Sequence, residues 1–540
     1  MSPRLLHPDE YELLSRSSLD SRDSFDLDAA DFESHPTAGR SYLHARPSLI
    51  SRLISLLPFS GRHPPRGRRP GQATWKKKKK ATFRRRLTLR RLCFISFAFS
   101  GIILALAFLT AIIHPSYTHP PAHYNKVRQA ALNSKEPGKG NPQNEKVFIA
   151  ASLYDRDGEL ARGRWGENVL ELIRLLGKDN VFLSIYENNS GAEGETALKQ
   201  FEQKVECKRS IVYEEHMDIN AVPHITLADG SKRIKRIAYL AEVRNRALQP
   251  LDDPASDRFD KLLFFNDVVF DPIDALQLLF STNVDKGGTA QYRAACAVDF
   301  INPFKFYDTF ATRDLEGFSM GVPFYPWFSS AGKAESRHDV LDQKDAVRVR
   351  SCWGGMVAFD AKFFQQDKAQ RQRKQNEQAP TTLAPRVSSV VKFRSESDIY
   401  WDASECCLIH ADIQKPPYES KDEPVDTGIY MNPYVRVAYD TQTLAWLGIT
   451  RRFERLYSVA HAIVNTIARM PRSNPRRTEV AGTDVEEKVW VPKGANGGSY
   501  EMIKRKAGTG GFCGRRELQV LVANPKPGQK NWETLPVPAG

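Results

Sequence analysis

Apolar and polar positions divide the chain into a long polar start, one unbroken apolar run and a mixed region. Residues 92–113 contain 22 consecutive residues without a charge, which is long enough to cross the hydrocarbon core of a bilayer as a helix. Beyond it, short apolar runs at 147–153, 181–186 and 262–265 alternate with helical patterns such as 234–248. This alternation predicts an α/β fold with a mostly parallel sheet and crossover helices.

The apolar run at 262–265 is the central strand of this prediction, because it has the continuous apolar character of a strand buried on both faces. It leads into Asn266 and Asp267. Ligands of open α/β sheets bind beyond the carboxyl ends of the strands, so Asp267 is placed to bind a metal or a phosphate. A plain turn residue is the alternative interpretation of Asp267. Asp271 and Pro272 fit the N-cap and first turn of a helix over 273–280.

The positive charge is concentrated before the apolar run. Residues 1–91 hold 20 Lys and Arg against 9 acids, a balance of +11, and residues 114–540 hold 58 against 55, a balance of +3. The composition of 1–91 predicts a disordered basic tail, and its position predicts that this tail is cytosolic by the positive-inside rule. Residues 92–113 then form a transmembrane signal anchor. A nucleic-acid-binding face is excluded because the folded region carries little net charge.

The remaining boundaries follow from composition. Residues 114–145, rich in Pro, His, Asn, Lys and Gly, predict a flexible lumenal stem. A catalytic domain is expected over 146–465, with a surface insertion at 365–385. Residues 466–540 are expected to be a largely unstructured extension. No glycine-rich phosphate loop opens any predicted helix, which disfavours dehydrogenases and P-loop enzymes.

Cysteines and one sequon suit a lumenal domain. Cys93 lies in the apolar run, and six further cysteines follow it. Disulfides persist in that compartment, but their pairing cannot be deduced from spacing. The spacing matches no structural zinc pattern. Asn188-Asn189-Ser190 is a sequon in a polar loop and predicts a glycan.

Three stretches carry further candidate chemistry. Arg244-Asn245-Arg246 ends a predicted helix, and arginine forks suit a diphosphate; a solvated helix face is the alternative. Gly354-Gly355 would let backbone approach a ligand closely, although a β-bulge explains the pair equally well. Residues 393–412 are dense in acids, and several near one pocket would suit acid-base or acceptor-hydroxyl work.

Together these motifs resemble a known family. Its marks are Phe148-Ile149-Ala150-Ala151, Arg244-Asn245-Arg246, the stretch 265–270, Cys352-Trp353-Gly354-Gly355 and the stretch 402–412. The order resembles the fungal capsule-associated α-1,3-mannosyltransferases, glycosyltransferase family 69, over roughly residues 146–450. The resemblance implies a GT-A-like, Rossmann-type domain in a single-pass type II Golgi membrane protein. It also implies GDP-mannose as the donor, a glycan as the acceptor and a divalent metal, usually Mn²⁺.

The same resemblance implies roles for individual residues. Asp267 would bind the metal, with His410 or Asp412 as a helper. The nucleotide-binding set would be Ala151, Arg244, Asn245, Arg246, Gly354 and Gly355. Glu405 and Asp402 would orient the acceptor or stabilise the sugar in a retaining transfer. Asn266 stands where the family's Asp-x-Asp element would begin, which raises the question of how the metal is held.

Other functions remain open on the sequence. A glycan-binding or scaffolding protein of the secretory pathway would keep the anchor and the fold but would not depend on a metal. A transferase could use a different sugar nucleotide on the same scaffold. A glycoside hydrolase built on a carboxylate pair would release free sugar without a nucleotide.

Overall fold

The computed structural model describes residues 73–538 apart from 134–135, 216, 228, 254, 256, 367–389, 416–425, 494–497 and 523–529. The described residues fall into two units, one of residues 73–109 and one of residues 110–538. Residues 1–72 of the predicted tail and most of the predicted insertion at 365–385 lie outside the described residues.

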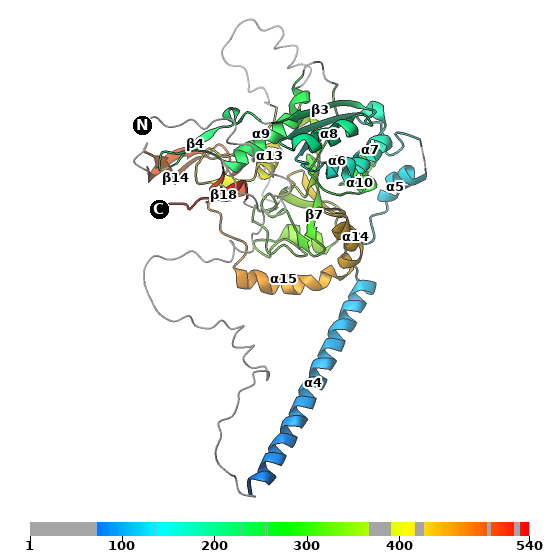
Figure 1. The fold of residues 1–540 in the computed structure, drawn as a ribbon, viewed down its shortest axis with the longest axis vertical. Helices are drawn as coiled ribbons and strands as arrows, with labels where there is room; N and C mark the ends of the chain where they lie inside the picture. Colours follow the sequence, from blue (N-terminus) through cyan, green and yellow to red (C-terminus); the bar gives the residue numbers. More distant parts are fainter. Residues whose placement is uncertain are drawn as a thin grey trace. The chain divides into compact units, whose positions relative to one another are not determined.

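Helix α4 (Ala73–Ile113) contains the apolar run (Figure 1). Its segment Cys93–Ile113 is long and apolar enough to cross a membrane. The helix begins well before the run, so residues 73–91 are helical rather than disordered as expected. Lysine, arginine and alanine are good helix formers, which lets the helix continue into the basic cluster.

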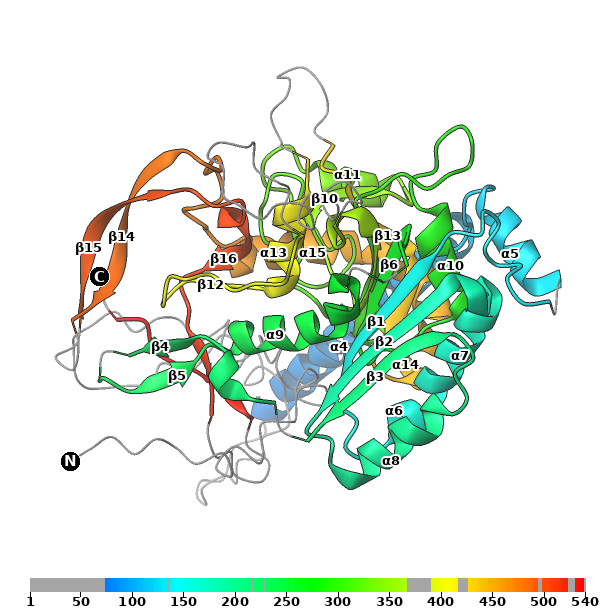
Figure 2. The same ribbon diagram turned by 90° about the horizontal axis from the view of Figure 1, so that it is seen from above.

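The second unit is built on one ten-stranded sheet (Figures 1 and 2). Its strand order is β3-β2-β1-β6-β11-β7-β13-β10-β9, and β8 pairs with β7. Strands β1, β2, β3 and β6 are mutually parallel, and β11 is antiparallel to both β6 and β7, so β7 and its parallel neighbour β13 run in the same direction as β6. This confirms the predicted α/β class with a mostly parallel sheet. The strand bounds are β1 Val147–Leu153, β2 Val181–Asn188, β3 Lys208–Glu214, β6 Lys261–Phe265, β7 Ala294–Asn302, β8 Lys305–Phe306, β9 Arg313–Asp314, β10 Val347–Ser351, β11 Met356–Asp360 and β13 Ile429–Ala438.

Helices cover both faces of this sheet, as Figure 2 shows for the two sides of β1 to β3. Alternate residues of β6 point to opposite faces: Leu262 and Phe264 join one apolar cluster, whereas Leu263 and Phe265 join the other. The first cluster includes α9 (Arg236–Leu248) and α13 (Glu405–Ile413). The second includes α7 (Arg164–Leu176), α8 (Gly191–Glu202) and α10 (Pro272–Ser281). Smaller helices are α6 (Glu159–Arg162) and α11 (Glu335–Leu341).

The predicted flexible stem is wrong in part, because residues after the apolar run pack onto the domain. Tyr117 is 1% exposed, and α5 (Tyr124–Asn133) buries Tyr124, Val127 and Ala131. The backbone carbonyl of Tyr124 accepts a hydrogen bond from Gln277 on α10 at 3.0 Å. The apolar residues that make these contacts are spaced among Pro, Lys and Asn, so composition alone concealed them.

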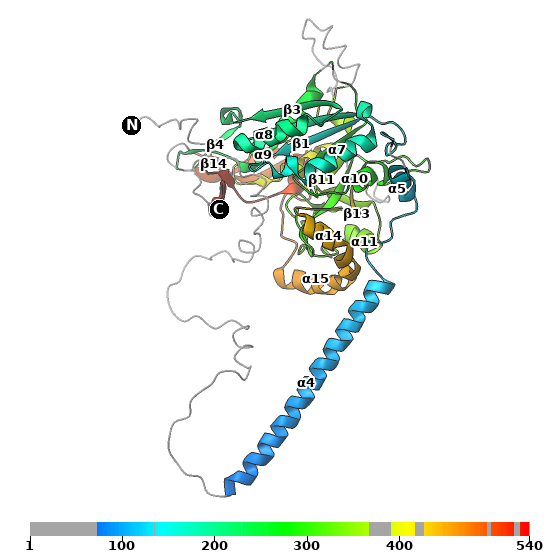
Figure 3. The ribbon, with the colours of Figure 1, turned by 45° about the vertical axis from the view of Figure 1, so that its right-hand side comes forward.

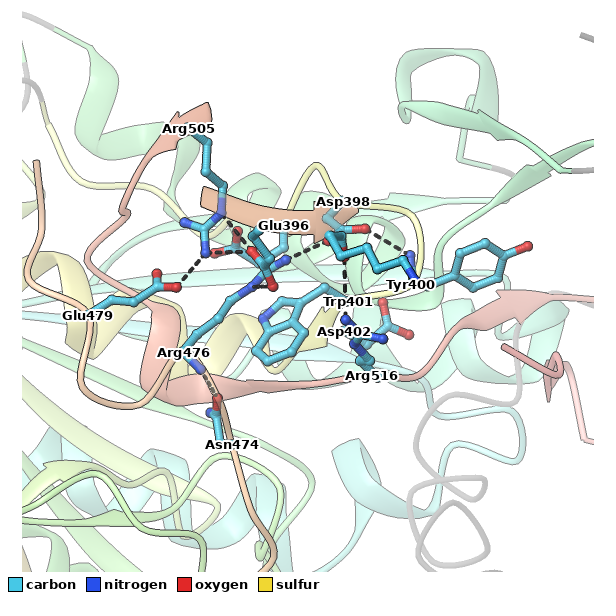
Figure 4. A network of polar contacts seen from close by, with 12 residues as sticks. Glu396, Asp398, Tyr400, Trp401, Asp402, Asn474, Arg476, Glu479, Arg505 and Arg516 are labelled. Carbon is cyan, nitrogen blue, oxygen red and sulfur yellow. Dashed lines mark hydrogen bonds and ion pairs between the residues drawn. The ribbon is translucent and has the colours of Figure 1, made fainter. Parts of the chain in front are cut away.

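The described part of residues 466–540, which was expected to be a largely unstructured extension, contains five strands: β14 (Asp484–Pro492), β15 (Gly498–Lys506), β16 (Gly514–Arg515), β17 (Gln519–Leu521) and β18 (Trp532–Thr534). Helices α14 (Thr441–Thr450) and α15 (Glu454–Ala468) come before these strands (Figure 3). Strands β14 and β15 form an antiparallel hairpin. Arg476, just before it, bonds Asp398 at 2.6 Å and Glu487 at 2.8 Å and stacks on Trp401 (Figure 4). Ion pairs order this region together with a small apolar cluster of Leu518, Val520 and Tyr400, against which Trp490 of β14 packs. These few apolar residues are spaced among polar ones, which is why the composition misled the prediction.

Two disulfides join segments far apart in sequence. Cys296 pairs with Cys352, and Cys407 pairs with Cys513 across 106 residues. Within the domain, Cys207 and Cys406 are buried and unpaired. In the chain-entropy model, a cross-link of the longer span stabilises the fold by about 4–5 kcal/mol. The cross-link fixes α13 to the C-terminal region.

Candidate active site

Asp267 lies just beyond the carboxyl end of β6, where the sequence predicted it. A second acid, Asp299 of β7, lies at the same level of the sheet. Val357 of β11 is opposite both Phe264 of β6 and Cys296 of β7. Three residues further along these two parallel strands are Asp267 and Asp299. Asp267 is half-buried, whereas Asp299 is fully buried. The carboxyl ends of β6 and β7 therefore both carry a carboxylate.

A buried group of carboxylates surrounds Asp299. Its two oxygens accept hydrogen bonds from the Asp308 N–H at 3.2 Å and from the Tyr439 hydroxyl at 3.1 Å. Burial, with the neighbouring Asp308 carboxylate, raises the pKa of Asp299 to about 8. Burial also raises the pKa of Asp308 to about 6, and Glu405 adds to the rise. Burial is the main reason that the pKa of Tyr439 is raised, and Asp267 is among the acids that raise it further. The raised pKa values mean that ionising all of these buried acids together is unfavourable.

Arg244 adds a positive charge next to Glu405 and Asn266. From α9 its Nε donates to Glu405 at 3.0 Å, and its Nη1 donates to the Asn266 side-chain oxygen at 3.1 Å. The guanidinium also lies 4.5 Å from the centre of the Trp353 ring. Burial alone would lower the pKa of Arg244, but Cys406 and Glu405 raise it above the ordinary value. Arg244 therefore keeps its positive charge despite its burial.

Asn266 holds this arrangement together. Its side-chain oxygen accepts from Arg244 and also from Trp353 Nε1 at 3.2 Å. Both lone pairs of that oxygen are therefore in use. Its backbone N–H donates to the Gly355 carbonyl at 2.9 Å. Asn266, the residue before Asp267, thus serves to position Arg244.

The glycine pair makes a close approach to protein rather than forming an open surface. Gly354 and Gly355 have φ of 57° and 66°, where only glycine is unstrained. A Cβ on Gly354 would lie 1.9 Å from the Ala297 carbonyl oxygen, and one on Gly355 would lie 2.7 Å from Val268. Ala151 is likewise buried in the sheet, between Ile185 and Phe265. These residues are part of the packed sheet beneath the site and do not form its surface.

The three residues of the Arg244-Asn245-Arg246 motif point in different directions, because successive helical residues lie about 100° apart. Asn245 exchanges hydrogen bonds at 2.9 Å with the backbone of Phe393. Arg246 pairs with Glu242 at 2.8 Å and lies 3.8 Å from Glu214. Of the three, Arg244 alone contacts Asn266 in the described structure.

Asp402 and His410 are turned to other partners. The Asp402 carboxylate pairs with Lys235 at 2.8 Å and accepts the Gln519 N–H at 2.6 Å. His410 is fully buried: its Nδ1 contacts the Cys406 carbonyl, its Nε2 lies 3.8 Å from Cys296 Sγ, and burial lowers its pKa to about 4. His410, Cys296 and Cys352 place ligand atoms within 4.8 Å of one another, but both sulfurs belong to a disulfide. Asp412 is held by Arg394 at 2.7 Å.

The predicted glycan site does not suit a glycan. The acceptor of the sequon, Asn188, is 3% exposed. Its amide nitrogen donates to the hydroxyl of buried Tyr239 at 2.8 Å. The sequence hid this because the polar residues that suggested a loop are the end of β2.

Sequence reasoning missed Glu187, near the end of β2. It is 1% exposed, and neither carboxylate oxygen has a hydrogen-bond partner in the described structure. Burial raises its pKa to about 7, Asp155 adds to the rise, and nearby Ser190 only partly offsets it. An acid near the end of an apolar strand was the signal that identified Asp267, and the same signal is present here.

The comparisons with known proteins address the region that carries this site. Residues 146–412 match the family model described as Cryptococcal mannosyltransferase 1. These residues belong to that family. Within it, Alpha-1,3-mannosyltransferase CMT1 of Cryptococcus neoformans var. neoformans serotype D is 24% identical over 217 residues, which cover 38% of this chain and 40% of that protein. The resemblance inferred from the motifs is confirmed, and the match spans about two fifths of the length of that relative.

Two solved structures also overlap with the chain. Mannosyltransferase PcManGT from Pyrobaculum calidifontis, in complex with GDP-Man and Mn²⁺, has 11% identity and a TM-score of 0.30, covering 70% of this chain and 77% of its own. Glucosyl-3-phosphoglycerate synthase from Mycobacterium tuberculosis, in complex with Mn²⁺, uridine diphosphate and phosphoglyceric acid, has 10% identity and a TM-score of 0.26, covering 73% and 96%. Overlaps with TM-scores this low support no argument about function.

Proposed function

We propose that the protein is a membrane-anchored, retaining mannosyltransferase that uses GDP-mannose and forms an α-1,3 linkage on a glycan acceptor. Family membership of residues 146–412 and the name of the matched relative support the sugar and the linkage. The observation that carries the proposal is Arg244, a charged and nearly buried guanidinium held beside Asp267 at the carboxyl edge of the sheet.

Arg244 would bind the donor diphosphate. A guanidinium has five N–H donors, and in the described structure Glu405 and Asn266 take two of them. Because Trp353 and Asn266 fix the group in place, little side-chain entropy remains to be lost on binding. Glu187, with two buried oxygens that lack partners, would accept hydroxyl or N–H donors of the nucleoside. The nucleotide would then lie across the ends of β2, β1 and β6.

The residues at this edge fit a divalent cation. Mn²⁺ and Mg²⁺ favour carboxylate oxygens, and the raised pKa values of Asp299 and Asp308 show a surplus of packed negative charge. Asp267 is half-buried and lies just beyond the end of β6, and it would be the ligand that faces the donor. When bound, the metal would neutralise charge on the leaving diphosphate. Asn266 is not needed as a ligand, because its oxygen is committed to Arg244 and Trp353.

The chain's own groups would then serve the transfer. Arg244 stabilises the diphosphate as the bond from the sugar to its oxygen breaks. A diphosphate oxygen takes the proton of the acceptor hydroxyl on the same face of the sugar, which retains the configuration. Glu405, fixed by Arg244, would orient the acceptor or stabilise positive charge on the sugar. Asp402 and His410 have no part in this proposal because their partners are structural.

The membrane part of the proposal rests on Cys93–Ile113. By the positive-inside rule, the basic residues before it would put the N-terminus in the cytosol and the domain in the lumen, which is the orientation of a type II Golgi protein. Protease protection in sealed microsomes tests this orientation. Digestion of an epitope at Gly540 without detergent would contradict it.

A panel of nucleotide sugars tests the activity. The full-length protein in detergent is offered GDP-mannose and other sugar nucleotides, with and without Mn²⁺, together with mannoside acceptors. Mannose transfer that requires GDP-mannose and a metal supports the proposal. Transfer of another sugar would change the donor, and free sugar released without a nucleotide would make the protein a hydrolase.

A further inference from the structure

Helix α15 packs onto the domain with its polar side. Its buried residues are Glu454, His461 and Asn465. Glu454 forms a two-pronged ion pair with buried Arg436, and Asn465 accepts the Val322 N–H at 2.7 Å. A surface helix of a globular domain normally turns its apolar side inward. Here the arrangement is reversed, so packing within the chain does not explain the apolar residues of α15.

Those apolar residues form a stripe along the exposed face of α15. Leu456, Val459, Ile463 and Ile467 are 37%, 65%, 57% and 76% exposed and recur at helical spacing. Trp446 and Ile449 of α14, 49% and 53% exposed, continue the apolar surface. After the membrane span, the described residues include eleven exposed large hydrophobic side chains, and six of them lie in α14 and α15. Concentration of this kind marks a site of interaction.

The charges beside this apolar face, defined here as the six residues just named, are positive. Residues 441–472 contain five arginines, at positions 451, 452, 455, 469 and 472. The acid in this stretch is Glu454, which is buried against Arg436. Arg452, Arg469 and Arg472 are exposed. An apolar face with a tryptophan, flanked by arginines, has the chemistry of a helix that lies in a lipid headgroup region.

The segment that follows the candidate membrane span contacts the domain close to this face. Tyr117 is four residues beyond Ile113, the end of the candidate span. It is pinned to the domain: its hydroxyl donates to the Val340 carbonyl at 3.1 Å, and its own carbonyl accepts from Arg451 Nη1 at 3.1 Å. Arg451 begins the short turn Arg451–Phe453 between α14 and α15. Four residues reach at most about 14 Å, so the end of the span cannot lie far from this turn.

We infer that the apolar face of α14 and α15 lies in the headgroup region of the bilayer that holds the anchor, with the arginines at lipid phosphates. This rests on the membrane anchorage of the proposed function. The face then acts as a second attachment, which fixes the orientation of the domain relative to the membrane. A second copy of the chain is the other possible occupant, and it predicts a different result in the same experiment.

Fluorescence quenching by lipids in proteoliposomes tests the inference with the full-length protein. In a Cys93→Ser background, a polarity-sensitive fluorophore is attached at Ile463→Cys. The matched control is Met502→Cys on β15, which is 65% exposed and outside the face. A third site, Phe108→Cys within the span, reports the anchor. The vesicles contain phosphatidylcholine with a doxyl quencher placed near the headgroup or near the end of the acyl chain.

The label at 463 is expected to lose more than about half of its emission to the shallow quencher, as a residue at the headgroup boundary should. The label at 502 should keep its emission, and the label at 108 should respond more to the deep quencher. An unquenched label at 463 with a quenched label at 108 would overturn the inference and leave the anchor intact. If neither is quenched, the anchorage itself fails. A blue-shifted but unquenched label at 463 would assign the face to a second copy of the chain.

Discussion

Helix α9 and the residue before it make two buried ion pairs with one short stretch, residues 402–405, and the two pairs differ in what surrounds them. Lys235, just before the helix, pairs with Asp402 at 2.8 Å. Arg244, nine residues later, pairs with Glu405 at 3.0 Å. In the first pair, Lys235 also donates to the carbonyls of Asp398 and Trp401, and Asp402 accepts from Gln519. In the second, the partners lead to Asn266 and the carboxylates at the strand ends.

The difference separates structure from function better than burial does. Both pairs are almost inaccessible, so exposure does not distinguish them. The Lys235–Asp402 pair is enclosed by backbone groups and ties the C-terminal region to the domain. The Arg244–Glu405 pair retains unused donors at the edge where a ligand is expected. We therefore expect losses at the first pair to appear as instability and losses at the second as weaker turnover.

The largest expected effect is on activity at Asp267, because the proposed function makes it the metal ligand that faces the donor. Asp267→Asn should lower mannose transfer about a thousandfold, as loss of a key electrostatic group does, with little change in melting temperature. Transfer and thermal unfolding are measured over a Mn²⁺ titration. The matched control is Asp271→Ala, which removes the N-cap of α10 and should cost about 1 kcal/mol of stability without loss of turnover. Activity of Asp267→Asn within a few-fold of wild type would remove Asp267 from the site.

Breaking the other pair should damage the fold. Asp402→Asn leaves Lys235 buried without a counter-charge and should lower the free energy of unfolding by about 3 kcal/mol. Urea denaturation measures this, and kcat/KM of the folded fraction should be near that of wild type. Lys235→Met added to Asp402→Asn should recover part of the loss. Normal stability with lost activity would return Asp402 to the catalytic group.

A pH effect tests whether the buried Glu187 is as isolated as the structure indicates. Its pKa is raised from 4.5 to about 7, so the folded state binds a proton that the unfolded state has already lost. Relative to Glu187→Gln, wild-type stability should match below about pH 4.5, fall as pH rises towards 7 and stay flat above it. The final difference should be about 3 kcal/mol. Denaturation curves across this range measure it, and parallel curves would mean that Glu187 is solvated or paired.

The smallest effect compares two arginines of one helix. Arg244→Lys should raise the donor KM about tenfold, because an ammonium cannot reproduce the fork of the guanidinium. Some stability will be lost with it, since Asn266 loses a partner. Arg246→Lys, which keeps its surface pairing with Glu242, should change KM by less than about twofold. GDP-mannose should raise the melting temperature of Arg246→Lys and fail to raise that of Arg244→Lys. Equal behaviour would contradict the assignment.

Sequence pattern predicted what depends on local order along the chain: the α/β sheet, the apolar run and the strand end at Asp267. It could not choose among Arg244, Asn245 and Arg246, because Arg244 and Asn245 are distinguished by contacts with segments more than a hundred residues away and with the strand end at Asn266. The same limit applies to Asp402 and Glu405, three residues apart with unrelated partners. The hairpin of β14 and β15 was missed because its alternation is weak and its order comes from Arg476 and Arg505 pairing with Glu487.

The bond between Cys407 and Cys513 sets an order of events during synthesis. Glu405 lies two residues before Cys407 on α13, and Cys407 is disulfide-bonded to a cysteine 106 positions later in the chain. Parallel strands β1, β2 and β6 can pair while the chain is still being translocated, but this fastening must await Cys513 and an oxidising compartment. The complete site would therefore form only after Cys513 has been translocated and oxidised, and chains that stop before it would remain inactive.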